Sequence, residues 1–202
     1  MRLHDRTIGL LPRPWRTLVD WGVTIAIAVA AVLIVETEVA KPFRVPSSSM
    51  EPTLRCAKPG QGCTASSSDR VIACRLCYRF GSPKRGQIVV FETPERAAAD
   101  CNAAGTYVKR LIGMPGDIVR EDDDGYVWIN GNRLDEPYVT DLARAQDSTG
   151  ERTWVVPESE YFFMGDNRGD SCDSRVWGSV PRGNLIGPLI VRYWPPGRID
   201  LG

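Results

Sequence analysis

Histidine is almost missing from this sequence, and that absence narrows the chemistry more than any other feature of the composition. His4 is the only histidine among 202 residues, and it precedes a long apolar segment. A serine or cysteine nucleophile commonly depends on a neighbouring histidine as its base. A membrane segment predicted below would separate His4 from the domain that follows it. Ser-His-Asp triads and Cys-His pairs are therefore excluded.

Two further absences limit the class of protein. The chain has no basic excess, since Lys+Arg and Asp+Glu both number 25, so no nucleic-acid partner is expected. A zinc site is not expected either, because Cys74-x-x-Cys77 lacks a second cysteine pair or histidines. The composition, 43% hydrophobic and 25% charged, is that of a globular protein. We expect no metal and no other cofactor, and the oligomeric state is left open.

One apolar stretch, Trp21–Val35, carries the strongest hydropathy signal. It is shorter than the roughly 20 residues of a transmembrane helix, but its flanks extend it. Arginines precede it and Glu36 and Glu38 follow it, so the positive-inside rule places the N-terminus in the cytoplasm. We therefore predict a single-pass protein of the cell membrane, anchored in the lipid bilayer. Its predicted parts are a cytoplasmic segment 1–17, a transmembrane anchor 18–38 and an extracytoplasmic domain 39–202.

The same apolar stretch has two other interpretations. A cleaved signal peptide has an apolar core of roughly 7–15 residues, and Ala28-Val29-Ala30 resembles its cleavage site. A mature N-terminus near residue 31 would support that interpretation. A buried core helix is the other, but apolarity on all sides and the preceding arginines argue against it.

Beyond Lys41 the chain contains short β-like runs separated by glycine and proline. Gly86–Thr93 and Thr106–Gly113 are predicted strands, and Asn130-Gly131 marks the turn of a hairpin. No long amphipathic helix is predicted after the anchor. We expect a mostly β, antiparallel domain, with a smaller β-hairpin subdomain inserted at about 118–160.

Six cysteines would lie outside the membrane, where disulfides persist. Six allow 15 pairings, so the connectivity is not deducible. Cys56 and Cys63 bracket a Gly/Pro loop, and a local bridge between them is the best prediction. For Cys74-x-x-Cys77 a structural role is favoured over a redox one.

The segment "VPSSSMEPTL" holds three serines between prolines, and a nucleophile among them would need a base other than histidine. Lysine can serve if burial lowers its pKa. In "TYVKRLIG" a strand would place Tyr107, Lys109 and Leu111 on one face, which makes Lys109 a candidate for desolvation. An edge-strand lysine that prevents aggregation is the alternative. The polar segment "GDNRGDSCDSR" is either a solvated loop or a buried network around such a lysine.

Three segments, "PSSSMEPTL", "YVKRLIGMPGD" and "GDNRGDSCDSR", resemble in order and spacing the motifs of bacterial type I signal peptidases (leader peptidases). The resemblance covers roughly residues 36–195. It implies a signal peptidase/LexA-like β fold and a Ser-Lys dyad, with Ser49 as nucleophile and Lys109 as general base. It also implies an oxyanion donor at Ser47, while Ser48 is expected to be only a spacer. The resemblance assigns support of the dyad to Ser171, Asp166, Asp173 and Arg175.

The resemblance further implies that the substrates are secretory preproteins cleaved after Ala-x-Ala-type sites, with small residues at −1 and −3. Such substrates would add to the domain as an extended strand. The residues that match the family's substrate-binding positions are Val45, Pro46, Met50, Leu54 and Val108.

The chain departs from the family's pattern in two places. The link after the first motif is unusually long and contains cysteines, and Cys172 stands beside Ser171 where a small residue such as alanine is common. A free thiol at Cys172 would expose the dyad to oxidation. Two other functions stay open: a self-cleaving LexA-like peptidase, and an anchored, disulfide-bonded binding module without catalysis.

Overall fold

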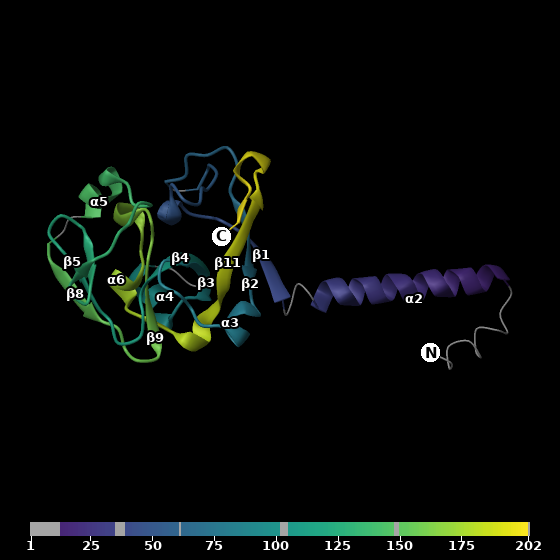
Figure 1. Ribbon diagram of the computed structural model, residues 1–202. Helices are drawn as coiled ribbons and strands as arrows, with labels where there is room; N and C mark the ends of the chain where they lie inside the picture. The colour runs from purple at the N-terminus through teal and green to yellow at the C-terminus, as the bar shows by residue number, and fades with distance from the viewer. Residues whose placement is uncertain (1–12, 35–38, 61, 102–104, 148–149, 202) are drawn as a thin grey trace. The chain divides into compact units, whose positions relative to one another are not determined.

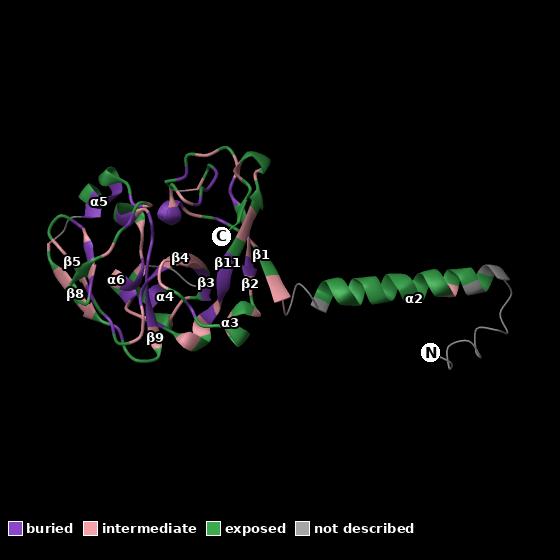
Figure 2. Ribbon diagram, viewed as in Figure 1, coloured by how far each residue is buried: buried purple, intermediate pink, exposed green. Residues whose placement is uncertain are grey.

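The computed structural model describes residues 13–34, 39–60, 62–101, 105–147 and 150–201, which form two units divided after Val39. The first unit contains helix α2 (Arg13–Ile34), whose described side chains are almost all exposed (Figure 2). Within the described ranges, no helix combines the length and the apolar character needed to cross a membrane. Residues 35–38 of the predicted anchor lie outside the described ranges, and the anchor stays a prediction.

The second unit is built on an eight-stranded antiparallel sheet (Figure 1). Its strands, in order across the sheet, are β1 (Ala40–Arg44), β2 (Arg70–Cys74), β11 (Leu185–Trp194), β3 (Ile88–Glu92), β4 (Thr106–Gly113), β9 (Glu160–Met164) and β10 (Val180–Pro181), and β12 (Asp200–Leu201) pairs with β11. The predicted strands at 86–93 and 106–113 correspond to β3 and β4. The prediction of a mostly β, antiparallel domain is confirmed.

A second antiparallel sheet lies between β4 and β9 in the chain. Its strands are, in spatial order, β7 (Asn132–Arg133), β6 (Val127–Ile129), β5 (Ile118–Glu121) and β8 (Arg152–Val155). Asn130 and Gly131 join β6 to β7 with φ values of 51° and 82°. Two successive positive φ values are those of a type I′ turn, so the predicted hairpin turn is confirmed.

The helices of the second unit are short, because no segment here repeats apolar residues at helical spacing for long. They are α3 (Cys77–Phe80), α4 (Glu95–Cys101), α5 (Asp141–Asp147) and α6 (Ser174–Trp177), with 3-10 turns η2 (Ser48–Met50), η3 (Arg168–Asp170), η4 (Arg182–Asn184) and η5 (Pro196–Arg198). Neither α4 nor α5 exceeds seven residues.

Strand β4 separates two parts of the core, because successive side chains of a strand point to opposite faces. Leu111 packs in a cluster with Phe91 and Phe163, whose rings stack with centroids 4.5 Å apart. Its neighbour Ile112 packs in another cluster with residues of β5 and β6, including Val119. The side chains of β4 therefore tie the large sheet to the small one.

All six cysteines lie in the described ranges and are paired. The bridges are Cys56–Cys63, Cys74–Cys77 and Cys101–Cys172. The predicted local bridge, Cys56–Cys63, is confirmed. The hypothesis of a free thiol beside the dyad is wrong, because Cys172 is bonded to Cys101 at the end of α4.

Candidate active site

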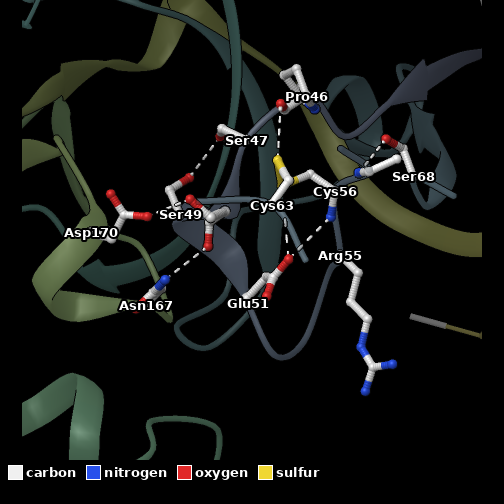
Figure 3. Close-up of a disulfide and its surroundings, with 12 residues drawn as sticks. Pro46, Ser47, Ser49, Glu51, Arg55, Cys56, Cys63, Ser68, Asn167 and Asp170 are labelled. Carbon is white, nitrogen blue, oxygen red and sulfur yellow. Dashed lines mark hydrogen bonds between the residues drawn. A yellow bond between two sulfur atoms is a disulfide. The ribbon is translucent and has the colours of Figure 1, made fainter. Parts of the chain in front are cut away.

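The three adjacent serines sit where an extended segment turns into η2. Ser47 has extended backbone angles (φ −132°, ψ 160°), whereas Ser48 and Ser49 are in the 3-10 turn and are buried. The hydroxyls of Ser47 and Ser49 lie 3.2 Å apart and share a hydrogen bond (Figure 3). Two predicted site residues thus come together.

Ser48 is more than a spacer. Its hydroxyl donates a hydrogen bond to the Asp170 carboxylate, and its side chain is buried. Gly62, from the loop closed by the Cys56–Cys63 bridge, packs against this pair, because a Cβ at position 62 would collide with both. The expectation that Ser48 only separates its neighbours is corrected by this contact.

The Lys109 side chain is buried in the interior and only 1% exposed. Its Nζ donates a hydrogen bond of 3.0 Å to Ser171 Oγ and lies 5.8 Å from the centroid of the Tyr107 ring. Burial lowers the pKa of Lys109 to about 8, although the negative charge of Asp173 opposes this shift. A substantial fraction of Lys109 is therefore neutral near pH 8, as a general base must be.

Asp173 anchors the residues around that amine. It caps α6 and accepts hydrogen bonds from Ser171 Oγ at 2.7 Å and from the Gly165 backbone N–H at 2.9 Å. Burial alone would raise the pKa of Asp173, but the charge and hydrogen bonds of Arg175 outweigh it and lower the pKa to about 2. Asp173 is thus ionised at any physiological pH. Its carboxylate orients Ser171, which in turn holds Lys109.

The loop that begins at Gly165 joins the serine and lysine segments. The Asn167 backbone N–H donates to the Ser49 carbonyl at 3.1 Å, and Asn167 Nδ2 donates to the Ser48 carbonyl at 3.2 Å. Gly165 itself lies so close to the Ser49 carbonyl and to Ser171 Oγ that a Cβ there would collide with both. Glycine is required for this close approach.

Asp166 holds the same loop from the other side. It accepts hydrogen bonds from Arg110 Nε at 2.8 Å and from Thr53 Oγ1 at 2.6 Å. Arg110 follows Lys109 on β4, and Thr53 follows η2, so one carboxylate links all three motif segments. Asp166 is among the predicted site residues, whereas Thr53 and Arg110 were missed, although both lie within the motif segments.

Among the described residues, no hydrogen bond joins Ser49 directly to Lys109. Ser49 is paired with Ser47, and Lys109 with Ser171. Catalytic hydrogen bonds in unliganded enzymes are often long and tighten only when substrate binds. The segments that carry the two groups are connected through Gly165 and Ser171 rather than by a hydrogen bond between Ser49 and Lys109.

A cavity of about 380 Å³ opens at Ser49. Its lining includes three of the predicted substrate-binding residues: Val45, Pro46 and Val108. The other two predicted residues, Met50 and Leu54, do not line this cavity. Both are fully buried in a cluster with the Cys56–Cys63 bridge. They pack in the core next to the serines.

One side of β4 is open along this cavity. Strand β9 pairs with β4 only from Arg110 to Gly113, while β3 pairs with it along the opposite side from Thr106 to Arg110. In the described part of the chain, residues 106–109 thus have no partner strand on the β9 side. An extended peptide could add there by backbone hydrogen bonding.

Comparisons with known proteins identify the family. A model of the family described as "Signal peptidase, peptidase S26" matches residues 18–194. A "Probable signal peptidase I-2" of Synechocystis sp. is 39% identical over 188 residues, covering 93% of this chain and 78% of the relative. "Signal peptidase IB" of Staphylococcus aureus is 29% identical over 194 residues, covering 89% of this chain and 91% of the relative.

The similarity extends to solved structures. One of them is the crystal structure of a signal peptidase I from Enterococcus faecalis V583, with 33% sequence identity and a TM-score of 0.45. The similarity covers 54% of this chain and 97% of that one.

Proposed function

Because the chain belongs to the signal peptidase family, peptidase S26, we propose that it removes signal peptides from secreted preproteins with Ser49 as nucleophile and Lys109 as general base. The chain is a serine peptidase, a hydrolase, and not a binding module without catalysis. The observation that carries the assignment of the base is the fully buried Lys109 amine, held by Ser171 with a pKa lowered to about 8.

The proposed reaction has two steps. Ser49 Oγ attacks the carbonyl carbon of the scissile peptide bond while Lys109 Nζ takes the hydroxyl proton. The C–N bond then breaks, Lys109 returns the proton to the leaving amine, and an ester to Ser49 is left. In the second step Lys109 Nζ takes a proton from a water molecule while the water oxygen attacks the ester carbon. The bond from that carbon to Ser49 Oγ then breaks, Lys109 returns the proton to Ser49 Oγ, and the signal peptide leaves with a new carboxyl group.

The negative oxygen of each tetrahedral intermediate needs hydrogen-bond donors that are already in place. We assign this role to the Ser49 backbone N–H and to the hydroxyl of Ser47, which lies 3.2 Å from Ser49 Oγ. Removing one such donor typically costs roughly 10²–10³ in kcat in other serine peptidases.

The substrate is proposed to bind as an extended strand beside residues 106–109, with small side chains at −1 and −3. The open side of β4 and the cavity lined by Val45, Pro46 and Val108 support this mode. A precursor with leucine in place of alanine at −1 should be cleaved far more slowly than the Ala-x-Ala precursor. Equal rates for the two would contradict the assignment of this cavity to small side chains.

The membrane anchor at 18–38 is part of the proposal. The apolar run Trp21–Val35, with arginines before it and Glu36 and Glu38 after it, supports it. The full chain should stay in the membrane pellet after alkaline extraction, whereas a chain starting at residue 39 should not. A mature N-terminus near residue 31 would contradict the anchor.

The catalytic assignment is tested by cleavage of a model Ala-x-Ala precursor in detergent. Ser49→Ala and Lys109→Ala should each abolish cleavage while the thermal unfolding transition is retained. Residues of the same types outside the site supply matched controls: Ser82→Ala and Lys84→Ala should cleave at the wild-type rate, because both side chains are exposed. Cleavage that survives both changes in the dyad would refute the assignment.

A further inference from the structure

Arg175 connects the surroundings of Lys109 to the small sheet. On one side its Nε and Nη2 each donate to the Asp173 carboxylate at 2.8 Å. On the other side its Nη1 donates to Asp147 Oδ2, and it lies 3.8 Å from Glu121 Oε1. Asp147 ends α5 and Glu121 ends β5, so both carboxylates come from outside the motif segments.

Strands β5 and β8, which are neighbours in the small sheet (Figure 1), contribute the residues that hold the two carboxylates. Glu121 on β5 lies opposite Arg152 on β8 in the strand register. Arg152 Nη2 donates to Glu121 Oε2 at 2.9 Å and to Asp147 Oδ1 at 3.3 Å. Glu121 is 1% exposed and Asp147 is 8% exposed, so water does not replace these contacts.

We propose that Glu121 and Asp147 are positioning residues for Lys109, acting through Arg175, Asp173 and Ser171. The proposal rests on the proposed function, in which Lys109 is the base. Every connection is a contact between named atoms: carboxylate to Arg175, Arg175 to Asp173, Asp173 to Ser171, and Ser171 to Lys109. The small sheet thereby determines where the amine is held.

Arg175 needs polar partners on both sides, and the charge of Asp147 matters more than that of Glu121. A buried guanidinium is unfavourable unless carboxylates face it, and Arg175 has Asp173 on one side and Asp147 with Glu121 on the other. The charged groups that face Glu121 are Asp147 of α5, Arg152 of β8 and Arg175 of α6. Burial, together with its carboxylate neighbour, raises the pKa of Glu121 to about 7, despite both arginines. Glu121 is therefore partly protonated at neutral pH, a state that glutamine imitates.

The charge of Arg175 also lowers the pKa of Lys109. Removing the negative charge of Asp147 would leave Arg175 less compensated and would lower the pKa of Lys109 further. The rate would then begin to rise at a lower pH. A change that only weakened the fold would reduce the amount of active enzyme without moving this part of the profile.

The test compares the kinetics of full-length variants in detergent on the Ala-x-Ala precursor. We expect Asp147→Asn to lower kcat roughly 10- to 100-fold, the usual cost of a slightly misplaced catalytic group. KM should stay within about twofold, because the change removes no substrate contact. The acid side of the kcat/KM profile should move to lower pH. Glu121→Ala should lower kcat in the same way, and Glu121→Gln should restore most of it.

The matched control is a neighbouring ion pair of the small sheet, in which Arg120 adjoins Glu121 on β5 but points to the opposite, exposed face. Arg120 and Glu151 form an ion pair of 3.0 Å, but their side chains are 33% and 57% exposed. Arg120→Gln and Glu151→Gln should therefore leave kcat and the pH profile unchanged. If Asp147→Asn does not fold, Arg152→Gln replaces it as the test of the positioning role, since Arg152 is partly exposed and contacts both carboxylates. In that variant kcat should fall while KM stays unchanged.

The outcomes separate this proposal from the proposed function. If Ser49→Ala abolishes cleavage but Asp147→Asn, or Arg152→Gln in its place, keeps the wild-type kcat and pH profile, the positioning role is refuted and the peptidase assignment stands. If Ser49→Ala cleaves normally, the assignment of the nucleophile itself fails.

Discussion

Burial of Lys109 has a consequence for stability as well as for catalysis. Its pKa is lowered from about 10.5 in the unfolded chain to about 8 in the fold. Between these values the unfolded chain binds more protons, so the free energy of unfolding rises with pH from 8 to 10.5. Below pH 8 the fold must bury a charged amine.

Replacing Lys109 with an apolar residue should therefore stabilise the protein. We expect Lys109→Met to raise the free energy of unfolding by about 2 kcal/mol at pH 7. Each unit by which burial lowers the pKa of Lys109 is worth about 1.36 kcal/mol, and the lost hydrogen bond to Ser171 offsets part of this gain. The gain should shrink as the pH rises to 10.5. Denaturant unfolding at pH 7 and pH 10 measures the gain and its decrease with pH. A variant less stable than wild type at pH 7 would contradict this account.

Adjacent serines should respond differently to the same substitution. Ser47→Ala should lower kcat roughly 100-fold with little loss of stability, because it removes a proposed oxyanion donor. Ser48→Ala should cost about 1 kcal/mol of stability, since it removes the hydrogen bond to Asp170, and should change kcat much less. Comparing kcat and thermal unfolding of both variants tests this; similar losses of kcat would argue against separate roles.

At the scale of elements, the disulfide Cys101–Cys172 ties α4 to the segment that holds Lys109. It closes a loop with a sequence separation of 71, whereas Cys74–Cys77 spans only 3. Loop-closure entropy predicts a loss of roughly 4 kcal/mol for Cys101→Ser/Cys172→Ser and under about 2 kcal/mol for Cys74→Ser/Cys77→Ser. Denaturant unfolding of the two double variants provides the measurement. Equal losses would contradict a stabilisation that depends on loop length.

The elements that could be predicted from the sequence are those with local signals. Strand β4 follows from its alternating pattern, and the β6–β7 turn from Asn130-Gly131. The lack of histidine only favours a lysine as base, and the assignment of Ser49 and Lys109 comes from the resemblance of the motifs around them to the signal peptidase family. Glu121 and Asp147 carry no such signal, because they reach Arg175 only through the packing of β5, β8 and α5 against the motif loop.

At the scale of the whole molecule, each motif segment contributes one part of the candidate site. The turn η2 carries the serines, β4 carries Lys109, and the loop starting at Gly165 contacts both. The small sheet supports this loop through Arg175. The loop that starts at Gly165 thus contacts the segments of both Ser49 and Lys109, which are 60 positions apart in the chain, and this supports the proposal that they act together.

The pH dependence of cleavage tests the central claim most directly. If neutral Lys109 is the base, kcat/KM for the Ala-x-Ala precursor should rise about tenfold per pH unit below pH 8 and level off above it, given the pKa of about 8. The measurement is made from about pH 6 to 10, with unfolding monitored at each pH. A rate independent of pH over this range would contradict a lysine base.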